Sequence, residues 1–339
     1  MQALEELPES DKDELFPFFS LRSWTTAHNL DSALIRLEEA YGDRPLFIDL
    51  IEPEFVENRR PVHDQLDMLR NPANGYRAWC NFIEEHPNFV PALQLNDPVQ
   101  VRAETVRLHA LGRGMIVPIP RVPTSFPLVP GIAQSVASST NQGRDVCFFL
   151  DFGRAHGDLI MQQMATSTAI TAILNAAPNA FVAISASSFP DTFVSVTEQE
   201  IYERALFSGV SMHLNSRRLI YSDRGSARAE RQSGGGGGTI PPRIDYAERT
   251  RWTFFRADGA DARLNSYQAQ ASRTMNSESW DARLRLWGTQ MIERTAIGDN
   301  AAIISPAKAT AVRINIHLHR QLFYDDPIGV YNTDEEWRD

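Results

Sequence analysis

Acidic side chains follow several short apolar segments of the sequence, at the point where each segment ends. Glu52, Asp97 and Asp151 come after three different segments, and Asp223 ends a fourth. Carboxylate oxygens are the ligands that Mg²⁺ and Mn²⁺ prefer in proteins. Neighbouring parallel strands would bring these acids to one edge. We therefore predict that Glu52, Asp97 and Asp151 bind a divalent metal and that all four acids belong to a catalytic site.

Arginines occupy the same kind of position and add a second type of chemistry. Arg22 follows the first apolar segment, Arg121 the fourth and Arg256 the last. A guanidinium group binds two phosphate oxygens at once. Metal-binding acids beside phosphate-binding arginines are the layout of metal-assisted phosphoester hydrolysis. The alternative is structural: these side chains form ion pairs along the edge and cap helix N-termini.

Two adjacent hydroxyl groups end another apolar segment, in the stretch VAISASSFPDTF at residues 182–193. Ser187 and Ser188 stand just before Phe189 and Pro190, where a turn would usually carry glycine or asparagine. The G-x-S-x-G motif of serine hydrolases is absent, and no histidine is placed to act as a base for them. We predict that both serines bind phosphate or carbonyl oxygens of a ligand, or cap a following helical turn.

Histidines and cysteines are weaker candidates. The stretch INIHLH places His317 and His319 two residues apart, which on a strand would put both on one face, where they could bind a metal. A helix, which their late position favours, points them in different directions and gives them a structural role. His28 is the histidine best placed to act as a catalytic base. Cys80 and Cys147 lack metal-site spacing, and we expect buried free thiols.

The elements that must position these groups are short apolar strands that alternate with amphipathic helices. The expected strands are Phe16–Leu21, Leu46–Ile51, Phe89–Leu95, Met115–Ile119, Val146–Asp151, Phe181–Ala186, Leu219–Ser222 and Trp252–Arg256. Most are apolar on both faces, as parallel strands covered by helices are. The expected helices are Asp31–Tyr41, Gly75–His86, Pro98–Leu111, Met161–Ala176, Thr197–Phe207, Trp280–Arg294 and Ala309–Phe323.

Eight strands with a helix after nearly every one predict an α/β fold, a (β/α)8 TIM-like barrel with extra C-terminal helices, as a single domain over residues 1–339. Its active site would lie at the mouth formed by the carboxyl ends of the strands, where Asp49 and Glu52 end the second strand. A doubly wound open sheet is the alternative. It would carry a glycine-rich phosphate turn after the first strand, and SLRSWTTAHN contains no glycine.

One segment interrupts this alternation. Residues 228–246, RAERQSGGGGGTIPPRIDY, contain five consecutive glycines followed by two prolines. Such a stretch has high backbone entropy and little apolar surface to bury. We predict a flexible loop inserted between the seventh and eighth strands, either a spacer or a lid over the barrel mouth. Residues 331–339 are expected to form an acidic, solvated tail.

Charge and hydropathy narrow the class of protein. The chain is 42% hydrophobic and 22% charged, which is typical of a globular protein with a sizeable core. Its net charge of -10 argues against a broad nucleic-acid-binding surface. No apolar run reaches the roughly 18 residues that span a bilayer, and the acidic start argues against a signal peptide. We predict a cytoplasmic protein without a membrane segment.

Ordered sequence matches indicate a family. The opening LFPFFSLRSWTTAHNLDSALIRLEEAYGDRPLFIDLIEPE is followed by DVCFFLDFG, SSFPDTF, LIYSDRGSA, WTFFRADG, LWGTQMIERTAIGDN and INIHLH. In this order they resemble the Beta protein family of phages and bacteria, and SSFPDTF is the most recognisable of them. The resemblance spans nearly the whole chain. It implies a barrel-like α/β protein from a phage or from a bacterial mobile or defence locus, in a family without an established activity.

Carried over by position, the strand-end groups of the family fall on six residues of this sequence: Glu52, Asp151, Ser187, Ser188, Asp223 and Arg256. The chain also departs from the family pattern. Ser20 and Arg22 stand where the family has lysines on its first strand, and Ser222 and Arg224 replace the usual glycine and tyrosine. A lysine-dependent step of the family would therefore be lost or replaced here.

Two functions follow as hypotheses. The first is an enzyme, a metal-assisted phosphoester hydrolase that uses Mg²⁺ or Mn²⁺ on a phosphorylated or nucleotide-like molecule. The second is a binding module of a phage–host conflict system, in which the mouth captures a small phosphorylated ligand or a protein partner without turnover. A structural phage component is a third possibility, and it predicts an oligomer whose interface covers the mouth.

Overall fold

In the computed structural model of the protein, the structure describes residues 1–24, 26–53, 55–120, 125–155, 157–230, 241–257 and 266–333. The chain forms two compact units, and each is built from separate stretches of sequence. The parallel unit consists of Phe16–Ala186 and Glu203–Asp223. The terminal unit consists of Met1–Leu15, Ser187–Tyr202 and Arg224–Asp339, so it contains both ends of the chain.

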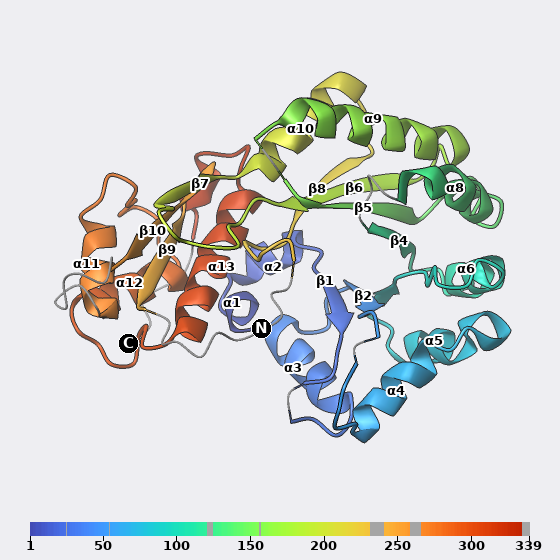
Figure 1. The fold of residues 1–339 in the computed structure, drawn as a ribbon, viewed down its shortest axis with the longest axis horizontal. Coiled ribbons are helices and arrows are strands. Elements are labelled where there is room, and N and C mark those ends of the chain that lie inside the picture. The colour runs from blue at the N-terminus through green and yellow to red at the C-terminus, as the bar shows by residue number, and fades with distance from the viewer. Residues whose placement is uncertain are drawn as a thin grey trace. The chain divides into compact units, whose positions relative to one another are not determined.

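The parallel unit carries two sheets (Figure 1). The first has the order β1 (Phe18–Leu21), β2 (Leu46–Leu50), β3 (Phe89–Pro91), and the second has the order β4 (Met115–Pro120), β5 (Val146–Arg154), β6 (Phe181–Ser187), β8 (Leu219–Asp223). In the first sheet, β2 pairs in parallel with both β1 and β3. In the second sheet, β4 pairs in parallel with β5, and β6 pairs in parallel with β8. A parallel bridge between Ala92 and Ile116 joins the two sheets. Apolar residues on both faces of most strands explain this arrangement, because parallel sheets are covered on both sides.

Helices connect successive strands of the parallel unit. They are α3 (Asp31–Tyr41), α4 (Pro61–Leu69), α5 (Ala73–Glu85), α6 (Val101–Ala110), α8 (Val129–Ala137), α9 (Leu159–Ala176) and α10 (Tyr202–Leu214), with a short 3₁₀ helix at Phe126–Leu128. Their apolar faces pack toward the strands. On α5, for example, Trp79 is fully buried and its indole nitrogen donates to the carbonyl of Ala92 at 3.0 Å.

The opposite faces of the strands share an apolar interior. Ala92, Ile116, Cys147 and Ala183 form its buried cluster, and three phenylalanines pack against it. The rings of Phe18 on β1 and Phe149 on β5 meet edge to face, with centroids 4.8 Å apart. Because side chains alternate along a strand, residues two positions further on face the same interior near the carboxyl ends. We call this the inner face.

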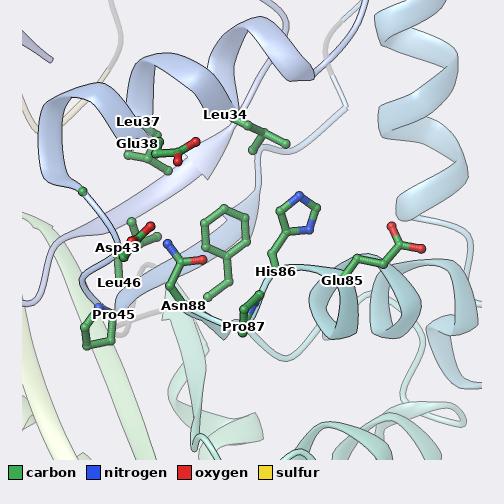
Figure 2. Close-up of a pocket in the computed structure, with 12 residues that line it drawn as sticks. Leu34, Leu37, Glu38, Asp43, Pro45, Leu46, Glu85, His86, Pro87 and Asn88 are labelled. Carbon is green, nitrogen blue, oxygen red and sulfur yellow. The ribbon is translucent and has the colours of Figure 1, made fainter.

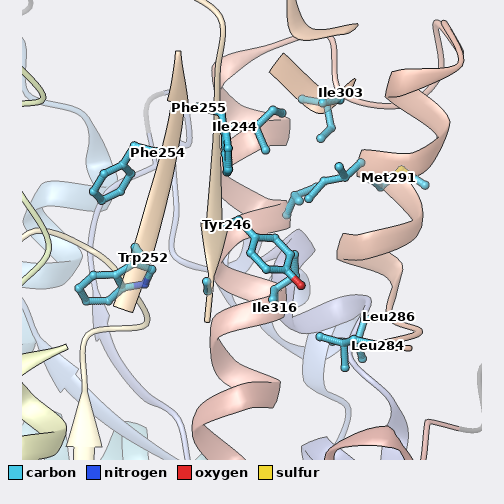
Figure 3. Packing of buried hydrophobic residues seen from close by; sticks show 14 of the residues in the cluster. Ile244, Tyr246, Trp252, Phe254, Phe255, Leu284, Leu286, Met291, Ile303 and Ile316 are labelled. Carbon is cyan, nitrogen blue, oxygen red and sulfur yellow. The ribbon is translucent and has the colours of Figure 1, made fainter. Parts of the chain in front are cut away.

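The terminal unit is built on an antiparallel sheet with the order β7 (Glu198–Glu200), β10 (Arg251–Arg256), β9 (Arg243–Ala247). Its helices are α1 (Gln2–Glu5), α2 (Glu9–Glu14), α11 (Tyr267–Met275), α12 (Trp287–Ala296) and α13 (Pro306–Leu322), followed by a 3₁₀ turn at Gly329–Tyr331. Aromatic and aliphatic side chains from the strands and from α12 and α13 form one core (Figure 3). Trp287 is buried in this core and Trp280 packs against it.

The long helix α13 ties the chain ends to this core. Asn315 is fully buried, and its side-chain amide donates to the carbonyls of Ala3 and Glu6, both at 3.1 Å. His319 lies 2.6 Å from Asp11 through Nδ1 and 2.9 Å from the carbonyl of Val330 through Nε2. INIHLH is therefore helical, and the structural role predicted for its histidines is confirmed for His319.

The (β/α)8 TIM barrel predicted from the sequence is wrong. Among the described residues, β8 does not pair with β1, so the parallel strands do not close. The expected eighth strand, β10, pairs antiparallel with β9 and β7 in the other unit. Only residues 248–250 separate β9 from β10. So short a connection makes a hairpin, whereas a parallel pairing needs a long crossover.

The structure also bears on the predicted glycine-rich loop, on one predicted helix and on the predicted tail. Residues 243–246, which we assigned to the glycine-rich loop, form most of β9, and residues 231–240 of that loop lie outside the described residues. Thr197–Phe207 is not one helix, because β7 precedes α10 there. Residues 334–339 of the predicted tail also lie outside the described part of the chain. No helix within that part is long and apolar enough to cross a membrane.

Candidate functional site

The residues predicted from the sequence are divided between the two units. Arg22, Glu52, Asp97, Asp151 and Asp223 belong to the parallel unit, whereas Ser187, Ser188 and Arg256 belong to the terminal unit. Arg121 lies outside the described residues. Within the described stretches, no group of three His, Cys, Asp or Glu side chains could hold a metal ion. The carboxyl edge of the parallel strands nevertheless carries a connected polar site.

A hydrogen-bonded chain of three residues lies at this edge. Asp49, on β2, stands two residues after Phe47 and so faces the inner face, beside Ser20 of β1 in the strand register. The side-chain amide of Gln94 donates to Asp49 Oδ1 at 2.9 Å, and its backbone N–H donates to Glu104 Oε1 at 3.0 Å. The chain therefore connects Asp49 on β2, through the segment after β3, to Glu104 on α6.

Burial controls the electrostatics of this chain. Removal from water raises the pKa of Asp49 from 3.8 to about 6, although the hydrogen bonds from Gln94 and Leu50 and the charge of Arg70 lower it. Glu104 is fully buried, and burial raises the pKa of its carboxyl well above the usual value, with Asp49 adding to the rise. Burial therefore favours the protonated form of Glu104, whereas Asp49 titrates close to neutral pH. A carboxyl of this kind can take and return a proton during a reaction.

The loop between Gln94 and α6, the helix that carries Glu104, is held by contacts with α5. The hydroxyl of the buried Tyr76 accepts a hydrogen bond from the backbone N–H of Asp97 at 3.0 Å. Gly75 has a φ of +67°, and a Cβ there would lie 2.8 Å from that of Ala103. Only glycine suits both this backbone conformation and this close approach to α6. The side chain of Asp97 accepts from the N–H of Val99 at 3.0 Å, so this predicted metal ligand also shapes the turn before α6.

Other charged groups lie at the carboxyl ends of the parallel strands, and the charge of Arg70 acts on Asp49. Arg70 on the loop after α4 donates to the carbonyl of Ile51 through Nε at 2.9 Å and Nη2 at 2.6 Å, which fixes the end of β2. Arg22 and Glu52 are exposed just past β1 and β2. Asp151 pairs in register with Pro120 and accepts from the N–H of Gly153 at 2.9 Å. The edge thus combines one titrating carboxyl with exposed groups of both signs.

The sequence indicated part of this site. Asp49 was expected at the end of the second strand, but Gln94 and Glu104 were given no role. A signal for Glu104 is present, because it stands on the apolar face of VRAETVRL with Val101 and Leu108, where a glutamate is unusual. Gln94 has no comparable signal, because it follows the strand in a segment without helical periodicity.

Ser187 and Ser188 hold the chain where β6 ends. The Ser187 hydroxyl donates to the carbonyl of Ala227 at 2.6 Å and accepts from the N–H of Phe189 at 3.2 Å. The Ser188 hydroxyl donates to the carbonyl of Glu200 at 2.9 Å and accepts from the N–H of Tyr202 at 3.1 Å. Both side chains are buried. Their hydroxyl protons are therefore committed to backbone carbonyls, and ligand binding by these serines stays a prediction.

Replacing either serine is expected to cost stability even without a ligand. Ser187→Ala or Ser188→Ala removes two hydrogen bonds, one donated and one accepted by a buried hydroxyl, which at about 0.5–1.5 kcal/mol each should lower the free energy of unfolding by about 1–3 kcal/mol. Urea denaturation of the purified protein measures this loss. Thr192→Ala, an exposed hydroxyl of the same segment, is the control and should change little. Serine variants as stable as the control would show that these contacts are dispensable.

Asp223 and the two cysteines have local roles. Asp223 accepts a hydrogen bond from the Tyr221 hydroxyl at 2.7 Å, and the guanidinium of Arg204 lies over the Tyr221 ring, 3.5 Å from its centroid. Cys80 and Cys147 are buried free thiols, as predicted. Burial raises the pKa of each thiol to about 12, so neither is a thiolate nucleophile at neutral pH.

A cavity of about 640 Å³ lies at the opposite ends of the strands (Figure 2). Leu46 and Phe89, the first residues of β2 and β3, line it together with side chains of α3. His86 stacks on Phe89 and is 2.7 Å from the carbonyl of Phe82 through Nδ1. Asp43 at its rim is exposed. The cavity is therefore separate from the carboxyl edge, and Asp43 serves below as a control position.

Comparison with known proteins identifies the family. The model of the Beta protein family matches residues 1–323. Protein beta of Enterobacteria phage P4 is 26% identical to the chain over 354 aligned positions, which cover 99% of this chain and 94% of that protein. No solved structure matches the chain. The family match confirms the resemblance seen in the sequence: this chain belongs to the Beta protein family.

Proposed function

We propose that this Beta-family protein binds a small polar ligand at the carboxyl edge of β1, β2 and β3, and that Asp49 exchanges a proton with that ligand. The observation that carries the proposal is the hydrogen-bonded chain from Asp49 through Gln94 to Glu104. It holds a half-buried carboxyl at the inner face, with a pKa of about 6.

The location supports a ligand site. In α/β proteins, ligands bind outside the carboxyl ends of parallel strands, where loops bring side chains of several strands together. Asp49, Gln94, Arg22 and Glu52 come from the ends of three neighbouring strands. A carboxyl whose pKa is shifted toward neutrality at such an edge is a candidate acid or base. Arg22 and Glu52, which are exposed, would contact charged parts of the ligand.

The roles within the site follow from protonation. Burial favours the protonated form of Glu104, whose Oε1 accepts from the backbone N–H of Gln94, and the side-chain amide of Gln94 donates to Asp49. Asp49 keeps a second carboxylate oxygen, Oδ2, which can accept a proton from the ligand or return one. In this arrangement Asp49 is the reacting group, and Gln94 and Glu104 position it.

Ligand capture from a cell extract tests the proposal. The purified full chain is incubated with a small-molecule extract of bacterial cells, separated from unbound compounds by ultrafiltration and analysed by mass spectrometry. The wild type and the control Asp43→Asn should retain the same compound, and Asp49→Asn should lose it. If Asp49→Asn retains that compound equally, or if the wild type retains none, the proposed site is wrong.

The same experiment separates catalysis from binding. A compound that returns chemically altered by the wild type, and unaltered by Asp49→Asn, indicates acid–base catalysis. A compound that returns unaltered indicates a binding protein, which is the second function considered from the sequence.

A further inference from the structure

A group of arginines on the terminal unit surrounds a single carboxylate. Arg313 on α13 donates to Asp245 Oδ2 through Nη1 at 2.7 Å, and Arg243 on β9 donates to the same oxygen through Nη2 at 2.8 Å. Asp245 and Arg313 are each 5% exposed. One carboxylate balances one guanidinium, so this contact leaves one positive charge without a counter-charge in a largely buried setting.

A third arginine, Arg256, adds to the excess of positive charge. Arg256 stands directly opposite Arg243 in the register of β9 and β10, so both side chains lie on the same face of the hairpin. Like charges in this position repel each other. Within the described stretches, the side chain of Arg256 forms no ion pair. On the same face, Asp245 stands opposite Phe254.

Neighbouring positive charges also affect the buried side chain of Arg313. Burial lowers the pKa of Arg313, and the charges of Arg243 and Arg228 lower it further, although Asp245 opposes this change. Uncompensated charge in a protein interior is costly, and proteins relieve it by pairing or by binding a counter-ion. Arg243 and Arg313 are therefore held close together around the single carboxylate of Asp245, and their mutual repulsion opposes this arrangement.

Aromatic rings hold the guanidinium groups in place. The guanidinium of Arg243 lies 3.5 Å from the ring centroid of Phe193, and that of Arg313 lies 4.1 Å from Phe189. Both rings belong to SSFPDTF. Arg313 also donates through Nε to the hydroxyl of Ser226 at 3.1 Å, and Ser226 is buried with a φ of +58°. Stacking on a ring leaves the N–H edges of a guanidinium directed outward in its own plane.

We propose that Arg243 and Arg256, supported from below by Arg313, bind an oxyanion of the phosphate class. The Nε and Nη2 groups of Arg243 already face the two oxygens of Asp245, so Arg243 contacts the anion through Nη1, while the planar guanidinium of Arg256 can match two of its oxygens. The anion supplies the negative charge that Asp245 alone does not. Arg243 is 24% exposed in its side chain, so the anion reaches it from solvent. This site lies within the terminal unit and does not depend on the chemistry of Asp49.

Titration calorimetry of the full chain with inorganic phosphate tests this site at constant ionic strength. Arg256→Gln and Arg243→Gln should each weaken phosphate binding by at least about tenfold, because each removes a charge-assisted contact. Arg249→Gln is the matched control, since Arg249 is an exposed arginine of the same hairpin whose side chain bonds to the carbonyl of Tyr324. The affinity of Arg249→Gln for phosphate should stay within about twofold of that of the wild type.

Melting temperatures keep the test independent of folding. Arg256→Gln loses no ion pair with a described residue, so in chloride it should melt at or above the wild-type temperature. Phosphate should raise the melting temperature of the wild type and of Arg249→Gln more than that of Arg256→Gln. General salt effects are the same for all three proteins. The proposal fails if the wild type shows no saturable phosphate binding, or if Arg256→Gln binds phosphate as well as the control does.

Two further probes identify the source of the phosphate group. Adenosine monophosphate and O-phosphoserine are titrated beside inorganic phosphate. Tighter binding of the nucleotide than of inorganic phosphate assigns the site to nucleotides, and tighter binding of phosphoserine assigns it to phosphorylated protein. Equal binding of all three assigns it to the free anion.

Discussion

At pH 8 the Asp49→Asn variant is expected to melt at a higher temperature than the wild type. The pKa of Asp49 is about 6 in the folded protein, against 3.8 for an unperturbed carboxyl. Ionised Asp49 therefore destabilises the folded state at high pH by up to about 3 kcal/mol. Asparagine keeps the acceptor oxygen for Gln94 and carries no charge. For a unit of this size, the gain corresponds to about 5–10 °C.

The stability that Asp49 contributes to the folded protein decreases as the pH rises. A carboxyl with a raised pKa binds its proton more tightly in the folded chain than in the unfolded chain. Its contribution to stability is therefore fully present below about pH 4 and is lost as the pH rises through about 6. Melting curves at pH 5 and pH 8 should show a smaller fall for Asp49→Asn than for the wild type.

Asp43→Asn is the control for Asp49→Asn, because it removes the charge of an exposed aspartate from the same unit. It should change neither the melting temperature at pH 8 nor its pH dependence by more than about 1 °C. If Asp49→Asn melts at a lower temperature than the wild type at pH 8, then ionised Asp49 does not destabilise the folded state, and the prediction is wrong. Higher stability together with loss of the captured ligand would show that the charge is kept for function rather than for folding.

The parallel half of the fold could be read from the sequence because its strands leave a strong pattern. β2, β4, β5 and β6 are covered by protein on both sides, so nearly every residue in them is apolar, and their expected ends lie within a few positions of the observed ones. β3 is shorter than expected, since the apolar run continues past Pro91 into the loop that carries Gln94. Buried loops and strands leave the same apolar pattern.

The terminal unit was missed for physical reasons. β7 has the sequence EQE and pairs with β10 through its backbone, so no apolar residue reveals it. β9 begins with Arg243 and contains Asp245, whose carboxylate pairs with Arg243 and with Arg313. β10 was recognised, but the direction of a strand is set by the length of its connection. Three residues between β9 and β10 impose a hairpin, and the hairpin removes the eighth barrel strand.

The candidate site was only partly predictable for a related reason. Strand-end residues are visible in the sequence, which is how Asp97, Asp151 and Glu52 were selected. Their selection assumed a closed ring, in which all ends converge. In an open arrangement, neighbouring strands bring groups together only pairwise, and the hydrogen bonds of the site join Asp49 to Gln94 and Gln94 to Glu104. Such contacts depend on loop conformation, which residue types alone do not determine.

Asn315→Ala is expected to be among the most destabilising single substitutions in the terminal unit. Asn315 donates to the carbonyls of Ala3 and Glu6 and accepts from the N–H of Gly288 at 3.0 Å, so one side chain joins α1 and α12 to α13. It is fully buried. Alanine removes three hydrogen bonds to backbone groups, two of them in the buried interior, at a cost of about 3–5 kcal/mol. The melting temperature should fall by about 10 °C or more.

Limited proteolysis identifies the segment of the Asn315→Ala variant that becomes accessible to cleavage. Because Asn315 holds α1, the N-terminal segment Met1–Leu15 should become the preferred site of cleavage, ahead of the hairpin of β9 and β10. Asn332→Ala, an exposed asparagine of the same unit, is the control and should match the wild type in melting and in cleavage.

A second variant, Asn315→Asp, separates the hydrogen bonds from packing, since it keeps the size of the side chain. The carboxyl that it introduces donates one hydrogen bond when it is protonated and none when it is ionised. The stability of this variant should therefore improve as the pH falls, because burial raises the pKa of such a carboxyl. Melting curves between pH 5 and pH 8 measure this change. An Asn315→Asp variant that gains no stability at low pH would mean that the three hydrogen bonds do not hold α1 in place.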